Sequence, residues 1–565
     1  MGRSKFSLFL LVCFGCLLSV PTLPRAQTIQ RAPWYETSVD STSIELGFQT
    51  TSAQTATVSY GTTNQFELGT MSAGASSMHS VVLSGLKPST TYELQIRSGT
   101  DTVTFYSSTA SDHHSSGEID VYFNRSIDSS YRSRYRLALG NQDFLGLLHE
   151  KILQAQRSID LAVYSFGGAT GDSVAAWLIG AKARGILVRF IADSASTKNS
   201  ASYHSLLAAG IPAILNSFGN NGKVASNIHH NKFIVIDGRS GDGVNTWVLT
   251  GSWNLTDQQT TTDYQNIIHL QDLSIARQFE REFNEEWGSD QDQPDARYAR
   301  FSTNKHDTTA RTFKIGGKTV HLFFSPNGGA FSGVNQILMS AKSQVMFALL
   351  VFTRQDLSAT LIADHATGVQ VHGIINNTDK YEQGDTLRKA GLDVLNFNQP
   401  GNVLLHHKYA IVDPGSATAT VITGSYNWSL SAEIANNENL LTVQSDSISI
   451  FYFQEWLKRY HENGGIQQVA LPSNEVATAS QFISTASIYP NPATSFVTIE
   501  WIETRAGRTR VTISDLTGRR VFDQSSYAPS GRASMTANTW NRSGLFTVVI
   551  EHDGVKDVKK LIIQP

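Results

Sequence analysis

Cysteine is almost absent from this chain of 565 residues, which contains two. Both of them, Cys13 and Cys16, lie in residues 1–26, where basic residues precede a short apolar run. This pattern is typical of a secretory signal peptide, and we expect cleavage near Ala26. The mature chain would then contain no cysteine, which excludes disulfide bonds, a thiolate nucleophile and a cysteine-based metal site.

Positive charge is also scarce, with 45 Lys and Arg residues against 48 Asp and Glu residues and a formal net charge of −3. Loss of the signal peptide removes Arg3, Lys5 and Arg25 and takes the charge from −3 to −6. A mildly acidic protein has no overall attraction for nucleic acid, although a local basic groove remains open. The apolar run of residues 6–20 is short for a membrane-spanning helix, and no later segment is long and apolar enough to span a bilayer.

A chain of this length exceeds what one hydrophobic core supports and predicts several domains. Residues 27–110 alternate short apolar and polar runs between turn residues, which is typical of a β-sandwich. Helical and strand patterns alternate from 111 to 470, which predicts α/β layers built on mixed sheets. After a linker at 471–484, residues 485–565 return to β patterns. We therefore expect a multidomain protein with an α/β core flanked by all-β sandwich domains.

The α/β region is a duplication, with halves at 111–300 and 301–470, because the same order of elements occurs in both. Apolar residues at helical spacing precede a strand of buried type, and a second helix and strand follow. The predicted elements are helix 144–155, strand 158–165, helix 172–184 and strand 186–191 in the first half, and helix 333–342, strand 345–352, helix 356–366 and strand 369–371 in the second.

One short motif occurs in each half. Its copies are His230-Asn231-Lys232, Asp237 and Gly251-Ser252-Trp253-Asn254 in the first half, and His406-His407-Lys408, Asp413 and Gly424-Ser425-Tyr426-Asn427 in the second. Residues two apart on a strand share a face, so the histidine and lysine of each copy point the same way. Docking of the two halves would bring two imidazoles, two ammonium groups, two hydroxyls and two amides into one pocket.

This set of groups suits displacement at a phosphodiester without a metal ion or cofactor. That reaction needs a nucleophile, an acid for the leaving oxygen and positive charge around the phosphoryl oxygens. Histidine can be nucleophile or acid because its pKa lies near neutrality. The predicted catalytic residues are His230, Lys232, His406 and Lys408, and the predicted phosphate-binding or supporting groups are Ser252, Asn254, Ser425 and Asn427.

The paired motifs resemble those of the phospholipase D superfamily, His-x-Lys-x4-Asp followed by Gly-Ser-x-Asn, over roughly residues 118–465. The resemblance implies His230 and His406 as the catalytic pair, a covalent phosphohistidine intermediate and no obligatory metal. Both motif copies lie in one chain, so we expect a monomer. Asp237 and Asp413 end hydrophobic strands, and we expect them to hold the local structure.

The two halves differ at one position that could separate the histidines' roles. The superfamily usually carries an acidic residue about thirty positions after each motif histidine, and this chain has Gln265 in one half and Glu438 in the other. A carboxylate favours imidazolium and an amide does not. If each group serves the histidine of its own half, Glu438 keeps His406 protonated as general acid and His230 is the neutral nucleophile.

The flanking segments carry two further resemblances. The run 83–94 resembles the tyrosine corner of fibronectin type III domains, with Tyr92 as the corner residue. The last segment opens with Ile488-Tyr489-Pro490-Asn491-Pro492-Ala493 and ends with Lys560-Leu561-Ile562-Ile563-Gln564-Pro565. With these motifs, residues 485–565 resemble the C-terminal sorting domain of the type IX secretion system, which implies export across an outer membrane by that machinery. We therefore expect a secreted or cell-surface protein.

Three functions fit these observations. The first is a secreted phospholipase D that hydrolyses phospholipids to phosphatidic acid and a free head-group alcohol, and the acidic charge favours this interpretation. The second is a secreted nuclease cleaving DNA or RNA, favoured by the Gly-Ser form of the motif and the modest length of the halves. The third, a non-catalytic adhesion protein, conflicts with two intact motifs. We expect His229 and His407 to face away from the motif side chains, and Trp253 and Trp428 to pack in the core.

Overall fold

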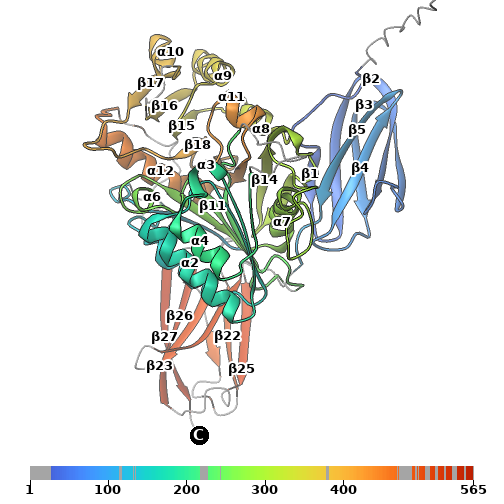
Figure 1. The fold of residues 1–565 in the computed structure, drawn as a ribbon. Helices are drawn as coiled ribbons and strands as arrows, with labels where there is room; N and C mark the ends of the chain where they lie inside the picture. The colour runs from blue at the N-terminus through green and yellow to red at the C-terminus, as the bar shows by residue number, and fades with distance from the viewer. Residues whose placement is uncertain are drawn as a thin grey trace, which may run out of the picture.

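A computed structural model describes most of the chain between residues 27 and 469 and the strands of the C-terminal segment (Figure 1). The predicted signal peptide at 1–26 and the predicted linker at 471–484 lie outside the described residues. The described ranges are 27–112, 117–131, 133, 135–216, 227–241, 243–376, 381–467, 469, 487–489, 493, 496–502, 509–515, 519–526, 530–536, 544–552 and 555–563.

The N-terminal segment forms an antiparallel sheet around a small hydrophobic core. Its strands are β1 (Glu36–Val39), β2 (Ser43–Gly61), β3 (Gly69–Ser84), β4 (Thr91–Ser98) and β5 (Asp101–Ser108). The apolar runs at 43–48 and 56–60 belong to one long strand, because the polar residues between them continue the pairing with β3 through shifted register. Buried Tyr92 accepts a hydrogen bond of 2.8 Å from the N–H of Lys87, the contact typical of a tyrosine corner.

The first α/β half contains a sheet with strand order β6-β12-β11-β10-β7-β8-β9, as far as the described residues show. Strands β7, β8 and β9 are parallel, and the other pairs are antiparallel. Every residue of β7 is buried, as expected for a strand covered on both faces. The elements are β6 (Ile119–Phe123), α1 (Phe144–Gln154), β7 (Ser158–Val163), α2 (Gly168–Ala183), β8 (Leu187–Ala192), α3 (Ser194–Thr197), α4 (Ala201–Ala208), β9 (Ala213–Leu215), β10 (Lys232–Ile236), β11 (Trp247–Gly251), α6 (Asp257–Thr261), β12 (Asn266–Leu270) and α7 (Leu273–Trp287).

The second half repeats this order as β14-β20-β19-β18-β15-β16-β17, with β13 added beside β14. Each predicted helix and strand of the two halves is present, with ends shifted by a few residues. The elements are η2 (Ser302–Asn304), β13 (Thr312–Ile315), β14 (Lys318–Ser325), α8 (Ala330–Leu338), β15 (Gln344–Leu349), α9 (Gln355–Ala366), β16 (Gln370–Ile375), α10 (Gly384–Lys389), β17 (Asp393–Asn396), β18 (Lys408–Val412), β19 (Thr420–Gly424), α11 (Leu430–Ile434), β20 (Glu438–Gln444) and α12 (Asp446–Glu462).

The two halves share one hydrophobic core. Helices α7 and α12 contribute large apolar side chains, among them Phe279 and Tyr452, that pack with residues from both sheets. Two hydrogen bonds then join the halves beside the motifs: the N–H of His230 donates to Asn437 O at 2.9 Å, and that of His406 donates to Tyr264 O at 3.0 Å. This shared core fixes the motif-bearing edges of the two sheets against each other.

The N-terminal domain packs on the α/β core rather than extending from it. Gln278 of α7 donates to Thr91 Oγ1 at 2.8 Å, and Trp34 stacks on His321 of β14 with ring centroids 4.0 Å apart. Arg277 also donates to the carbonyl of Ser89. Within the described parts of the chain, no helix is long and apolar enough to cross a membrane.

The C-terminal strands form two antiparallel sheets around a core of their own, below the α/β region in Figure 1. One sheet has the order β21-β22-β25 and the other β24-β23-β26-β27. The strands are β21 (Ser487–Tyr489), β22 (Phe496–Ile502), β23 (Thr509–Asp515), β24 (Arg520–Ser526), β25 (Ser530–Thr536), β26 (Gly544–His552) and β27 (Val555–Ile563).

Candidate active site

Equivalent strands present the motif residues from both halves. Lys232 begins β10 and Lys408 begins β18, with each motif histidine two residues earlier. Gly251 and Gly424 end β11 and β19 with φ of +148° and +133°. A Cβ at these glycines would lie 2.3 Å from Asn266 O and 2.5 Å from Asn439 O, so only glycine allows the backbone to approach the neighbouring strand this closely.

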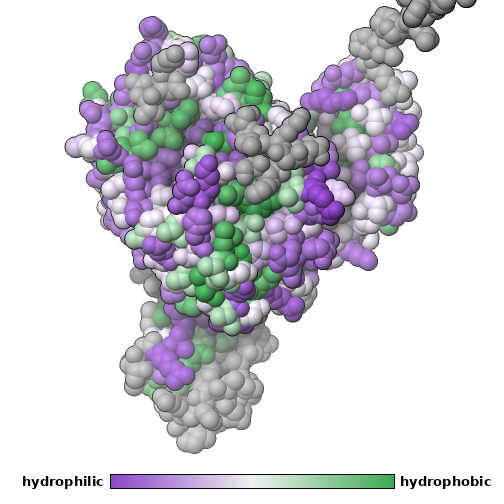
Figure 2. Space-filling view, in the orientation of Figure 1, coloured by the Kyte–Doolittle hydropathy of each residue, from purple (hydrophilic) through white to green (hydrophobic). Residues whose placement is uncertain are grey.

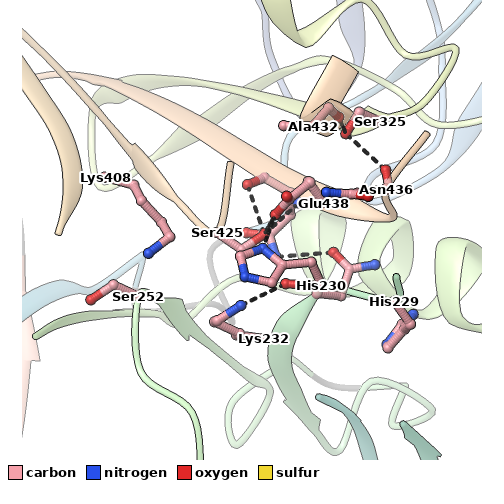
Figure 3. A network of polar contacts seen from close by, with 12 residues as sticks. His229, His230, Lys232, Ser252, Ser325, Lys408, Ser425, Ala432, Asn436 and Glu438 are labelled. Atoms are coloured by element: carbon pink, nitrogen blue, oxygen red, sulfur yellow. Dashed lines mark hydrogen bonds and ion pairs between the residues drawn. The ribbon is translucent and has the colours of Figure 1, made fainter. Parts of the chain in front are cut away.

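The imidazole of His230 contacts the carboxylate of Glu438, which belongs to the other half (Figure 3). Nδ1 and Oε2 are 2.7 Å apart, and both side chains are buried. Our expectation that each group serves the histidine of its own half is therefore wrong. Glu438 is the first residue of β20. This end of β20 lies against the first half, because the two halves dock through the sheet edges that carry the motifs.

His406 has the mirror-image arrangement with a neutral partner. Its Nδ1 lies 3.1 Å from Gln265 Oε1 and 3.0 Å from the carbonyl oxygen of Ser252, both in the first half. Each motif histidine is thus oriented at Nδ1 by the opposite half, one by a carboxylate and the other by an amide. In each of the two histidines, the other ring nitrogen, Nε2, is available to the substrate.

The motif serines fix these orienting groups. Ser425 donates to Glu438 Oε2 at 2.8 Å, and Ser252 donates to Gln265 Oε1 at 2.6 Å. We predicted both serines as phosphate-binding or supporting groups, and their hydroxyls are engaged behind the histidines. Their role in this structure is to hold the partners of the catalytic imidazoles.

Two buried lysines lie in the site. Lys232 and Lys408 each donate to the carbonyl oxygen of the histidine two residues earlier, at 2.8 Å, and are at most 3% exposed. Within the described residues neither forms an ion pair with a carboxylate. Burial lowers the pKa of Lys232 to about 7 and places the pKa of Lys408 well below its ordinary value. Buried cations of this kind are stabilised by an entering anion.

Burial also shifts the three other titratable groups of the site. It lowers the pKa of His230 and of His406 well below the usual value, and the nearby lysines act in the same direction. Burial raises the pKa of Glu438 to about 8, against the opposing effect of Lys232. A bound phosphodiester would supply the negative charge that favours protonated histidine and lysine.

The predicted phosphate-binding asparagines lie at the ends of the Gly-Ser-x-Asn segments. The Oδ1 atoms of Asn254 and Asn427 are buried without a hydrogen-bond partner among the described residues. Asn254 Nδ2 donates to Gln259 Oε1 at 3.2 Å, and Gln265 Nε2 donates to the same oxygen at 2.6 Å. Phosphoryl oxygens accept hydrogen bonds, so the Nδ2 groups rather than the Oδ1 atoms are the ones suited to bind them.

Asn266 and Asn439, which were not among the predicted site residues, link the middle residues of the two His-x-Lys segments across the halves. Asn439 Nδ2 donates to Asn231 Oδ1 at 3.2 Å, and Asn266 Oδ1 lies 3.1 Å from His407 Nδ1. Their equivalent positions in the sequence could have identified them, because they directly follow Gln265 and Glu438 in the two halves.

Tyr164, which directly follows β7, is a third residue that was not predicted. Its ring lies 5.0 Å from that of His230 and 5.3 Å from Lys232 Nζ. The hydrophobic pattern of the strand gave no reason to separate it from core residues.

Asp237 and Asp413 have the structural role expected of them. Asp237 accepts backbone N–H groups of residues 156–158 at 2.7–3.1 Å, and Asp413 accepts those of residues 342–344 at 2.7–3.0 Å. Both have left-handed backbones, with φ of 55° and 48°. The carboxylates therefore fasten the loops that begin β7 and β15.

The remaining expectations concern the residues beside the motifs. His229 and His407 face away, toward Glu286 at 3.4 Å and Glu455 at 3.1 Å. The described residues contain no group of three or more His, Cys, Asp or Glu side chains that could hold a metal ion. Trp253 and Trp428 are buried against phenylalanines, which confirms core packing.

Comparison with known proteins agrees with the duplicated geometry. Residues 148–287 and 334–460 match the family "Cardiolipin synthase, PLD-like domain", and residues 487–564 match "Secretion system C-terminal sorting domain". A mitochondrial cardiolipin hydrolase of Chlamydomonas reinhardtii is 33% identical over 143 residues, which are 25% of this chain and 61% of that protein. A phospholipase D of Rickettsia bellii is 27% identical over 144 residues, 25% of this chain and 69% of that protein. The chain thus spans less than two thirds of the length of the cardiolipin hydrolase.

Among solved structures, a phospholipase D family member, Nuc, from Salmonella typhimurium is 26% identical, with a TM-score of 0.24. The match covers 27% of this chain and 99% of Nuc. The phosphatidylserine synthase of Haemophilus influenzae is 11% identical, with a TM-score of 0.41 and coverage of 57% and 84%.

Proposed function

Because the chain belongs to the phospholipase D superfamily and ends in a type IX sorting domain, we propose that it is a secreted phosphodiesterase that hydrolyses phospholipids. The observation that carries the proposal is the buried pair of lysines between two histidines that are oriented from opposite halves. Such a site is complementary to a phosphate diester anion and holds nucleophile and acid on separate histidines.

His230 is the nucleophile in this proposal. A carboxylate at Nδ1 fixes the proton on that nitrogen and leaves the Nε2 lone pair for phosphorus. The phosphohistidine that forms keeps its Nδ1 proton and carries positive charge. That charge, 2.7 Å from Glu438, opposes the raised pKa of Glu438 and favours its ionised form, which stabilises the intermediate. If the carboxylate marked the acid, as we expected from the sequence, the observed pairing would make His230 the acid. His230 is assigned as nucleophile instead because the proton held at Nδ1 leaves the Nε2 lone pair free.

His406 is then the acid of the first step and the base of the second. As His230 Nε2 bonds to phosphorus, the bond from phosphorus to the leaving oxygen breaks and that oxygen takes a proton from His406 Nε2. A water molecule next gives a proton to His406 and attacks phosphorus, and the bond to His230 breaks. The neutral amide of Gln265 orients His406 without holding it as imidazolium, so the proton can move in both directions.

The lysines and asparagines complete the site. Lys232, Lys408, Asn254 and Asn427 bind the phosphoryl oxygens, where negative charge grows in the transition state. The names of the curated relatives, cardiolipin hydrolase and phospholipase D, support a phospholipid as substrate. The same groups would cleave a nucleic acid diester, so the test includes both substrates.

The test incubates the mature protein with phosphatidylcholine vesicles and, separately, with single- and double-stranded DNA, with and without a chelator. We expect choline release that the chelator does not affect, and intact DNA. His230→Ala and His406→Ala should each lower turnover by about 10⁴-fold, as for other residues that act as one catalytic unit. DNA cleavage without choline release would establish the nuclease alternative, and a wild-type protein inactive on both substrates would overturn the proposal.

A further inference from the structure

The helices that follow the two Gly-Ser-x-Asn segments differ in polarity. Helix α6 has the sequence Asp-Gln-Gln-Thr-Thr, and α11, at the equivalent place, has Leu-Ser-Ala-Glu-Ile. Asp257 thus corresponds to Leu430 and Thr261 to Ile434, each pair 173 positions apart like the motif serines. Leu430 is 59% exposed and Ile434 53% exposed. These two apolar side chains therefore leave more than half of their surface exposed to solvent.

The difference continues on the neighbouring loops. The carbonyls of Ser165 and Val351 accept equivalent hydrogen bonds of 3.2 Å from Leu255 and Trp428, so these two residues also correspond. Again the first half has a polar side chain and the second an apolar one.

Tyr381 is 64% exposed and lies near Val351. The residue after Tyr381, Glu382, accepts a hydrogen bond from the N–H of Phe352, which follows Val351. We call Val351, Tyr381, Leu430 and Ile434 the apolar rim. In Figure 2 hydrophobic side chains gather where Figure 1 labels α11 and α8.

The apolar rim and the polar helix α6 can each be assigned to one catalytic histidine. Ser425 and Glu438 of the second half orient His230, so the segment that continues into α11 lies on the His230 side. The carbonyl of Ser252 contacts His406, so the segment that continues into α6 lies on the His406 side. In-line displacement by His230 sends the leaving oxygen toward His406, and hence toward the polar helix.

We propose that the apolar rim is the surface by which this protein contacts a phospholipid bilayer and holds the acyl-bearing part of its substrate. The polar side around α6 then faces the departing head group. The inference rests on the proposed function and extends it, since it assigns the two ends of the substrate to the two halves. Exposed leucine, isoleucine and tyrosine side chains next to a site are typical of contact with the lipid interface.

The experiment replaces the apolar side chains of α11 with polar ones, like those at the equivalent positions of α6. In the full mature chain, Leu430→Ser combined with Ile434→Thr removes the two most exposed aliphatic side chains of the rim. The matched control is Leu153→Ser combined with Leu207→Thr, on α1 and α4, where these leucines are 58% and 43% exposed. Sedimentation with phosphatidylcholine vesicles measures binding, and hydrolysis of soluble bis(p-nitrophenyl) phosphate measures the chemistry apart from the interface.

We expect the rim variant to lose about tenfold or more in vesicle binding and in vesicle hydrolysis, because each buried aliphatic side chain contributes to partition into lipid. Its hydrolysis of the soluble diester, and both activities of the control, should stay within about twofold of wild type. Vesicle binding that is equal in wild type, rim variant and control, or absent in the wild type, would overturn the rim proposal. A wild type that hydrolyses neither the vesicles nor the soluble diester would instead overturn the proposed function, while the binding result still decides the rim.

Discussion

Glu438 of the second half lies 2.7 Å from His230 of the first, and this contact joins the two halves at the centre of the site. The reciprocal contact, from Gln265 to His406 at 3.1 Å, lacks a charge. Neither half therefore contains a complete pair of histidine and orienting group. The two halves contain similar sets of residues, but each orienting group contacts the histidine of the opposite half. A substitution of an orienting group in one half is therefore expected to act on the histidine of the other half.

The first prediction concerns two single substitutions, each of which replaces one orienting group with the kind found in the other half. Glu438→Gln should lower kcat by about 100-fold with little change in KM, because the orienting carboxylate of His230 is lost. Gln265→Glu should stabilise imidazolium at His406 and move the alkaline limb of the pH–rate profile to higher pH. Steady-state kinetics between pH 5 and about 9 measure both effects, and thermal unfolding controls for folding. A Glu438→Gln variant with wild-type kcat would remove Glu438 from the mechanism.

The second prediction concerns the covalent intermediate. In His406→Ala, an activated diester whose leaving group needs no proton should still phosphorylate His230, while hydrolysis stalls because the base is missing. Acid-labile, alkali-stable phosphate should then accumulate at His230, as peptide mapping by mass spectrometry would show. His230→Ala serves as the matched variant and should remain unlabelled. Label on His406 in that variant would reverse the two roles.

The motif residues could be predicted from sequence because their placement is local. A histidine and a lysine two residues apart at the start of a strand share a face, and β10 and β18 have this arrangement. The structural role of Asp237 was also predictable, since the residue ends a buried strand and belongs to the motif in both halves.

The exchange of partners could not be predicted, because it depends on how the two sheets dock. Gln265 and Glu438 stand just before or at the start of β12 and β20, and sequence alone does not show that these strand ends cross to the opposite half. Strand β2 could not be recognised as one continuous strand from sequence for a different reason, its composition. Its polar middle residues have the composition of a turn, but β3 pairs along both of its ends.

The third prediction uses the lowered pKa of Lys232, which is about 7 in the free protein. An anion that pairs with the ammonium raises that pKa, so binding is coupled to proton uptake. Sulfate keeps its charge across this range, and its affinity should be highest below pH 7 and fall by up to about tenfold per pH unit above it. Calorimetric titration at several pH values measures the effect. Lys232→Met should bind more weakly and with a flatter pH dependence, and an affinity independent of pH in the wild type would contradict the prediction.

The last prediction separates structure from catalysis at Asp237. Its carboxylate accepts three backbone N–H groups of residues 156–158, and its φ of 55° is left-handed. Asp237→Ala removes these hydrogen bonds and places alanine in a strained conformation, which together should lower the free energy of unfolding by about 3 kcal/mol.

Two further variants divide that loss into its causes. Asp237→Gly relieves the strain but restores no hydrogen bond, whereas Asp237→Asn tolerates the left-handed backbone and keeps one acceptor. The expected order of stability in urea denaturation is wild type, Asn, Gly, Ala, and Asp413 should behave in the same way. Turnover per folded molecule should stay near that of the wild type, because the carboxylate points into the loop rather than toward His230. An alanine variant that keeps its stability but loses turnover would make Asp237 part of the chemistry instead.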